Sequence, residues 1–277
     1  MVALALRDFN PVQIVTARML VGGFVLLLLV FLTRQSTRGL LKHWRWLLLI
    51  SAVNYTVPFI LVSTAQQSVT SAMTAVFMSA IPLFTLLMSR LLLSEAVSPR
   101  RWLGFTVGLA GLLWLAGTDV SYGRSQTGVP WAQLGLLLAC LLFALSAIVI
   151  RRMPRMPSMP ATAIMLLMGA ALLLPFQWLQ RAPIELAPAA SSVMALLVLA
   201  VFSTALGQFM RTFTIQRYGP IYFSIVGYLV PIWATGLGIW LLNEQVRLDQ
   251  FIAFAIIMAG LWFAHDGGFK AAESTQV

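Results

Sequence analysis

Long apolar runs, separated by short polar or proline-rich stretches, occupy most of the chain. Their apolar residues are continuous and do not alternate with a period of two, so they favour helices over barrel strands. A helix needs about 20 mostly apolar residues to cross a bilayer. The pattern therefore predicts nine membrane-spanning helices, at 11–32, 44–65, 72–93, 101–117, 131–150, 161–180, 193–213, 221–242 and 249–265.

Composition narrows the class of protein. Of 277 residues, 60% are hydrophobic and 9% are charged, and the mean hydropathy is +0.90. Soluble domains carry roughly 25% charged residues, so we expect an all-α polytopic protein whose surroundings are the lipid bilayer. One cysteine, Cys140, excludes an intramolecular disulfide. Two histidines leave little material for a metal site, and none is expected.

The basic residues predict the orientation. The formal charge of +10 is concentrated at the edges of apolar runs, which indicates membrane topology rather than a nucleic-acid partner. Thirteen Lys and Arg lie in the links after spans one, three, five and seven and in the tail, with Arg211 and Arg217 counted after span seven. Four lie on the opposite side. The positive-inside rule then places the C-terminus in the cytoplasm and residue 1 on the outer side. The predicted location is the inner (plasma) membrane.

An internal repeat appears when the sequence is shifted on itself by 149 positions. Pro82 then falls on Pro231 and Glu95 on Glu244, within nine identities over the 31 positions from Pro82 to Leu112. An odd number of spans per half predicts two inverted five-helix repeats. The predicted halves are 1–117 and 131–266, with a cytoplasmic tail at 267–277. The first half lacks its opening helix, so we expect that helix upstream of Met1.

Two repeated segments carry a family resemblance. Ala-Ile-Pro-Leu-Phe at 80–84 and Leu-Leu-Leu-Ser-Glu-Ala-Val at 91–97 recur as Leu-Val-Pro-Ile-Trp at 229–233 and Leu-Leu-Asn-Glu-Gln-Val at 241–246. Both resemble the EamA-type domain of the drug/metabolite transporter superfamily. Arg18 resembles the arginine of that family's second helix. The resemblance implies ten helices, cytoplasmic termini, and export of amino acids, metabolites or drugs from a central cavity.

Ionisable groups inside a membrane are functional candidates, and no acid lies at mid-depth in any predicted span. No carboxylate relay is visible, so the coupling ion is open and facilitated diffusion is possible. No nucleotide-binding loop, hydrolase elbow or zinc motif occurs, and we expect neither catalysis nor a cofactor. The chain is predicted to be a secondary transporter that exports a small amino-acid-like or lipophilic metabolite. The alternatives are a non-transporting subunit or sensor and, less favoured, a membrane-embedded enzyme. The sequence does not predict the oligomeric state.

Mid-span polar residues predict the substrate site. The repeat superposes Asn54 on Ser203 and Tyr55 on Thr204, and Ser79 and Tyr228 precede the prolines by three residues. Arg18 either faces the cavity, reaches the headgroups or forms a salt bridge. The predicted substrate-binding residues are Arg18, Asn54, Tyr55, Ser79, Ser203, Thr204, Gln208, Tyr228 and Trp233, with Phe59 as a further wall residue. Interhelical hydrogen bonding is the alternative role for these side chains.

The two repeated prolines, Pro82 and Pro231, are predicted hinges, because proline removes a hydrogen bond within a helix. Such interruptions at matching positions of two halves indicate a central transport site. Kinked helices that only pack against their neighbours are the alternative. Gly104, Gly108 and Gly111, with Gly260 as their counterpart, form small-residue faces that we expect to pack one helix against another.

Overall fold

The computed structural model describes residues 1–93, 98–121, 129–180, 188–220, 223 and 248–264, and all regular structure in these ranges is helical. Six described stretches are long and apolar enough to cross a bilayer: Pro11–Leu32, Leu40–Ala65, Met73–Leu93, Pro130–Arg152, Ser158–Leu179 and Ala190–Tyr218. Shorter apolar segments lie at Trp102–Gly111 and Phe251–Gly260. The chain is a multi-pass membrane protein, as its hydropathy predicts.

The helices of the first half begin with α1 (Val2–Ala5) and α2 (Pro11–Leu32), and a turn of 3₁₀ helix, η1 (Leu40–His43), leads into the next span. That span combines α3 (Trp44–Ile50), η2 (Ser51–Thr56) and α4 (Val57–Ala65). It is followed by α5 (Ser71–Met78), α6 (Ile81–Leu93) and α7 (Pro99–Ser121). The spans predicted at 11–32 and 44–65 have these same bounds, and the others shift by a few residues.

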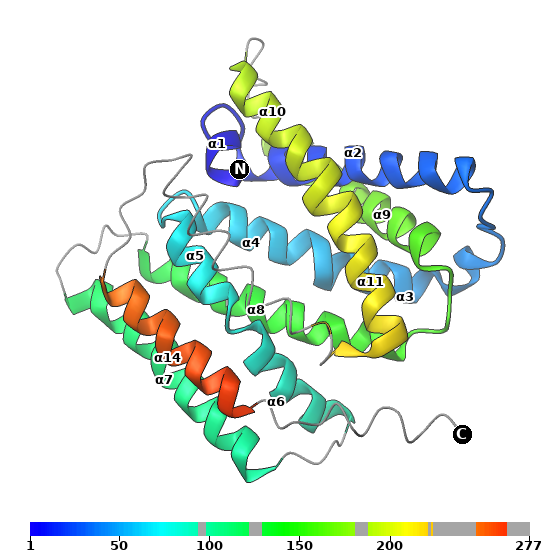
Figure 1. Cartoon of the computed structure of the whole chain (residues 1–277). Coiled ribbons are helices and arrows are strands. Elements are labelled where there is room, and N and C mark those ends of the chain that lie inside the picture. The colour runs from blue at the N-terminus through cyan, green and yellow to red at the C-terminus, as the bar shows by residue number, and fades with distance from the viewer. Residues whose placement is uncertain (94–97, 122–128, 181–187, 221–222, 224–247, 265–277) are drawn as a thin grey trace.

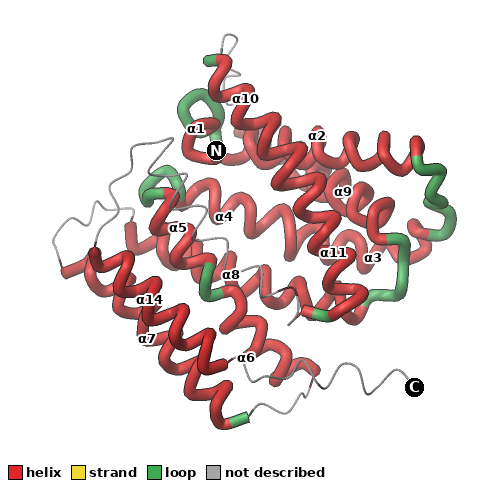
Figure 2. The backbone as a smooth tube through the Cα atoms, viewed as in Figure 1, coloured by secondary structure: helices red, strands yellow, loops and turns green. Residues whose placement is uncertain are grey.

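The second half contains α8 (Val129–Arg152), α9 (Ser158–Gln180), a span made of α10 (Ala190–Val198), η3 (Leu199–Leu206) and α11 (Gly207–Tyr218), and finally α14 (Leu248–Ala264). The described helices thus correspond to eight of the nine predicted spans. The span predicted at 221–242 lies outside the described residues, and so do Pro231, Tyr228 and Trp233. Figures 1 and 2 show the helices as an elongated bundle with α2 and α9 at one side and α7 and α14 at the other.

The start of α2 shows how local sequence sets a helix end. Asn10 Oδ1 accepts a hydrogen bond from the Gln13 backbone N–H at 2.8 Å, and Gln13 Oε1 accepts one from the Asn10 N–H at 2.9 Å. This reciprocal pair satisfies backbone donors that the first turn leaves open, and Pro11 already has the φ angle that a first turn needs. The helix therefore begins where the apolar run begins.

Two spans contain π-helical stretches in the middle of otherwise regular helix. These are η2, at Ser51–Thr56, and η3, at Leu199–Leu206. A shift of 149 positions places 51–56 on 200–205, inside η3. π-Helical turns are rare and are frequent at functional sites. The polar pairs Asn54–Tyr55 and Ser203–Thr204 lie on these two stretches.

Each π-helical stretch packs against a helix of the other half of the chain. In η2, Ser51 Oγ donates to the Met165 carbonyl at 2.7 Å and Thr56 Oγ1 to the Gly169 carbonyl at 3.2 Å, both on α9. Across from η3, a Cβ added to Gly22 of α2 would come within 2.9 Å of the Ala200 carbonyl oxygen. The two halves therefore contact each other at backbone atoms near the middle of these spans.

The span that contains Pro82 is broken rather than smoothly kinked. Helix α5 ends at Met78 and α6 begins at Ile81, so Pro82 occupies the first turn of a new helix, where its missing N–H costs nothing. Ser79 is fully buried, and its hydroxyl donates to the Val76 carbonyl at 2.6 Å. The regular helix is thus interrupted at residues 79–80, just before Pro82, and the hinge role of Pro82 stays a prediction.

Helices α7 and α14 run side by side at one edge of the bundle (Figure 1). A Cβ added to Gly260 would come within 2.5 Å of the Gly108 nitrogen and 2.6 Å of the Gly104 carbonyl oxygen. A Cβ on Gly111 would come within 2.9 Å of Ile256. The predicted packing role of these glycines is confirmed: a side chain on Gly260 would separate α14 from α7, and one on Gly108 would meet Leu83 of α6.

Candidate functional site

Arg18 lies inside the bundle, on the part of α2 that crosses η3. It is 6% exposed, its Nε donates to Thr204 Oγ1 at 2.8 Å, and its Nη2 donates to Ser203 Oγ at 3.3 Å. The guanidinium carbon lies 4.2 Å from the centre of the Phe59 ring. The side chain therefore points across the bundle to the polar pair of the second half, and not toward the headgroups.

A second buried arginine lies on α11. Arg211 is also 6% exposed, and its Nη2 donates to the Phe143 carbonyl at 2.8 Å and to Ser146 Oγ at 3.0 Å. Its Nη1 donates to Asn54 Oδ1. The prediction that Arg211 is a cytoplasmic loop charge is wrong, because α11 continues to Tyr218 and α8 and η2 supply this side chain with acceptors.

Asn54 joins the two halves on this side of the bundle. It is fully buried on η2, and its Oδ1 accepts from Ser146 Oγ at 2.8 Å as well as from Arg211. Its Nδ2 donates to Gln208 Oε1 at 3.3 Å. Each arginine thus contacts the polar pair of the opposite half: Arg18 contacts Ser203 and Thr204, and Arg211 contacts Asn54.

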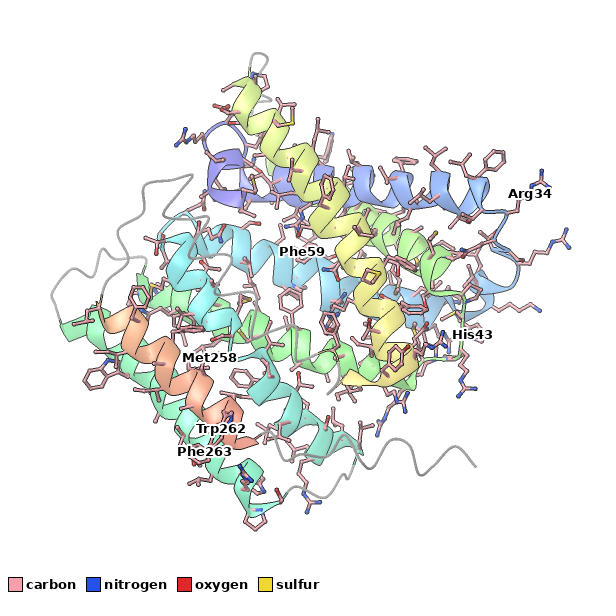
Figure 3. All side chains as sticks on the ribbon, viewed as in Figure 1. Arg34, His43, Phe59, Met258, Trp262 and Phe263 are labelled. Carbon is pink, nitrogen blue, oxygen red and sulfur yellow. The ribbon has the colours of Figure 1, made fainter. Side chains whose placement is uncertain are left out.

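Aromatic rings lie between the two arginines. Phe59, near the centre of the bundle on α4 (Figure 3), has its ring centre 6.1 Å from that of Phe143 on α8. Tyr55 lies 6.1 Å from Phe59, edge to face. The Arg211 guanidinium carbon lies 5.8 Å from the Phe143 ring centre and 5.6 Å from that of Phe223. Both cations are therefore also stabilised by ring faces.

Two buried hydroxyls at this cluster lie beside each other. They belong to Tyr55 and to Thr212, the residue after Arg211, and the Asn54 side chain also lies beside the Tyr55 hydroxyl. The Thr204 hydroxyl donates to the Leu199 carbonyl at 2.9 Å.

The arrangement brings together residues that the sequence predicted for a common site: Arg18, Asn54, Tyr55, Ser203, Thr204, Gln208 and Phe59. It does not include Ser79, whose hydroxyl bonds within its own helix. Sequence reasoning missed Arg211, Ser146 and Phe143. The signal for Arg211 was its position two residues inside the end of a predicted apolar span, since a charge there needs a buried partner.

The described residues hold no group of three or more His, Cys, Asp or Glu side chains able to bind a metal ion. Among the described residues, the two guanidiniums are the only charged side chains that take part in these contacts. The arrangement can therefore bind acceptor groups, and it offers amide and hydroxyl oxygens but no described carboxylate to a cation.

A separate polar contact lies at the N-terminal end of α10. Asp8 Oδ2 accepts from the Ala189 backbone N–H at 2.9 Å, and Ser192 Oγ donates to the Leu4 carbonyl at 3.1 Å. The hydrogen bond with the Ser192 hydroxyl, followed by that with the Ala189 N–H, lowers the pKa of Asp8 from its ordinary value of 3.8. The carboxylate therefore caps a helix from another segment of the chain.

The sequence is similar to those of several curated proteins. The chain is 25% identical over 260 residues to YedA of Escherichia coli (strain K12), described as an uncharacterized inner membrane transporter, with 93% of this chain and 82% of YedA covered. It is 22% identical over 258 residues to the uncharacterized transporter YoaV of Bacillus subtilis (strain 168), with 93% of this chain and 88% of YoaV covered. It is 24% identical over 227 residues to Protein PecM of Dickeya dadantii (strain 3937), with 80% of this chain and 74% of PecM covered.

The fold also has a counterpart among solved structures. One crystal structure superposes with a TM-score of 0.71 at 21% sequence identity and covers 95% of this chain and 91% of that chain. The model of the EamA-like transporter family matches residues 1–117 and 130–265. The resemblance seen in the repeated proline and glutamate segments is thus confirmed, and the chain belongs to the EamA-like transporter family of membrane transporters.

Proposed function

We propose that this chain is a secondary transporter of the inner membrane that exports a small organic metabolite by alternating access through a central site. Its relatives YedA and YoaV are described as transporters, the first in the inner membrane. The observation that carries the proposal is the buried polar cluster in which Arg18 of the first half bonds to Thr204, and Arg211 of the second half bonds to Asn54. A site shared by both halves can open to either side as the halves rock.

The inverted repeat is part of this proposal. Helices that the shift of 149 positions superposes lie against one another: α2 packs on α9, and α7 packs on α14. The two π-helical stretches also correspond by the same shift. Paired elements of this kind support a twofold relation between the halves 1–117 and 131–266, with the site on the shared axis. The helix break before Pro82 supports a hinge in the first half.

Flux measurements test the transport function. The purified full chain is reconstituted into liposomes, and efflux of preloaded labelled solutes is followed for amino acids, lipophilic amines and organic acids. We expect saturable efflux of one of these classes, reduced by Tyr55→Phe and unchanged by Arg155→Gln, an exposed residue away from the cluster. Efflux equal to that of empty liposomes for every class would overturn the proposal and leave the subunit or sensor role.

Thiol labelling tests the orientation. In a Cys140→Ala background, we expect Gln126→Cys to react with an impermeant reagent in intact cells and Ser274→Cys to react only after lysis. The expectation follows from the excess of basic residues in the links assigned to the cytoplasm. Labelling of position 274 in intact cells, with none at position 126, would reverse the orientation.

A further inference from the structure

We propose that the solute held at this cluster is a small organic dicarboxylate, with one carboxylate bound by Arg18 and the other by Arg211. The inference rests on the proposed transport function and names its substrate class. A neutral or zwitterionic metabolite, the amino acids included, would then be a poorer cargo than a dianion of similar size.

Charge is the first step of the argument. Two guanidiniums lie at 6% exposure within membrane-spanning helices, and their described partners are hydroxyls, an amide, a backbone carbonyl and ring faces. None of these neutralises a positive charge. Isolated charges in a membrane interior are expensive unless they are compensated. A ligand that brings two negative charges would compensate both.

Hydrogen-bond capacity is the second step. Nη1 of Arg18 and Nε of Arg211 donate to none of the described residues. The cluster therefore has a surplus of donors, and a carboxylate, which only accepts hydrogen bonds, matches that surplus. An ammonium group would find no described carboxylate here.

The aromatic rings explain why two separate carboxylates fit better than one compact anion. Arg18 lies over Phe59, Arg211 over Phe143, and the two ring centres are 6.1 Å apart. Each cation thus lies over a different ring of this neighbouring pair. The carbon chain of a dicarboxylate can lie along these rings while each end reaches one guanidinium.

A dianion also gives the transport step an electrical signature. The predicted spans hold no mid-depth acid that could carry a compensating cation. The solute therefore crosses with its own charge, and an inside-negative potential drives it outward. This direction agrees with export.

Binding is tested on the purified full chain in detergent. The melting temperature is recorded with sodium malonate, succinate, glutarate and adipate, with the monocarboxylates propionate and butyrate, with the neutral diamide succinamide, and with alanine. We expect the largest rise for one dicarboxylate, smaller rises for monocarboxylates, and none for succinamide or alanine. Equal rises for the dicarboxylate and for its monocarboxylate or diamide counterpart would overturn the proposal.

Charge-removing variants separate a binding role from a packing role. For Arg18→Gln and Arg211→Gln we expect the preferred dicarboxylate to bind roughly tenfold more weakly while monocarboxylate binding changes far less. Arg18→Lys and Arg211→Lys should recover part of the dicarboxylate preference, and Arg155→Gln should leave it unchanged. If both glutamine variants keep the preference, with only a lower melting temperature, the arginines hold helices together and the proposal fails.

Flux distinguishes this inference from the function on which it rests. Liposomes loaded with the labelled dicarboxylate should release it faster under an inside-negative potassium diffusion potential. Release that ignores the potential, or release of neutral and zwitterionic solutes only, would overturn the dianionic cargo and leave the transporter standing. Dicarboxylate binding with no solute crossing would overturn the transport function and leave the site.

Discussion

Arg18 and Arg211 are buried to the same extent but in different surroundings. Arg18 contacts two hydroxyls and lies 4.2 Å above a phenyl ring. Arg211 contacts an amide oxygen, a serine hydroxyl and a backbone carbonyl on two other helices. The difference is that Arg211 joins α11 to both α8 and η2, whereas the hydrogen bonds of Arg18 join α2 to η3 alone.

The largest expected effect comes from Arg211→Met. It removes buried hydrogen bonds to Asn54, Phe143 and Ser146 at once, so we expect the folded state to lose about 3 kcal/mol, the upper end for hydrogen bonds to a charged group. Transport should be abolished. The melting temperature and the monodisperse yield in detergent provide the measurement, with the exposed Arg217→Met as the matched control. A melting temperature equal to that of the parent would show that Arg211 does not hold α11 to α8 and η2.

Arg18→Met should abolish transport with a smaller loss of stability. Thr204 keeps its hydrogen bond to Leu199, and Ser203 is exposed, so fewer polar groups lose their only partner. We expect a loss of about 1 to 3 kcal/mol. Efflux per folded molecule and the melting temperature are measured side by side. A destabilisation as large as that of Arg211→Met would erase the contrast between the two arginines.

Tyr55→Phe should reduce transport at almost constant stability. The Tyr55 hydroxyl lies beside the neutral side chains of Thr212 and Asn54, so we expect its removal to cost only about 1 kcal/mol. Gly108→Leu is the contrasting variant, because a Cβ at this position already comes within 2.5 Å of Leu83. It should lower the folded yield and transport together. Parental efflux from Tyr55→Phe would exclude its hydroxyl from the site.

The smallest effect is expected outside the cluster, at Asp8. Its folded pKa is lowered, so its stabilising contribution is complete above the ordinary value of 3.8 and is lost as the pH falls through the lower folded value. The melting temperature of Asp8→Asn should therefore be slightly below that of the parent at pH 7, and the two should be equal at acid pH. A difference in melting temperature that stays the same at all pH values would show that ionisation of Asp8 is not involved. Transport at pH 7 should be unaffected.

Much of the fold could be predicted because hydropathy alone decides which segments enter a membrane. The start of α2 at Pro11 and the break before Pro82 followed from local chemistry that neighbouring residues cannot override. The repeat pointed to the polar pairs Asn54–Tyr55 and Ser203–Thr204, which lie on the two π-helical stretches. Arg211 could not be placed in this way, because its burial depends on acceptors contributed by Ser146 and Phe143, more than sixty residues away in the chain.

The π-helical stretch η2 has a consequence for insertions and deletions in this sequence. A π turn can form when one extra residue is inserted into a regular helix, and each residue of an α-helix turns the chain by about 100° and advances it about 1.5 Å. Removing Ala52 would let the span relax to regular helix. Because the π stretch holds that extra residue, the helix after it, Phe59 included, would keep close to its present rotation toward Arg18. The deletion would instead remove the local backbone shape at Asn54 and Tyr55. This span therefore tolerates the loss of a residue in η2 better than in α4, where the same deletion would turn everything that follows by about 100°.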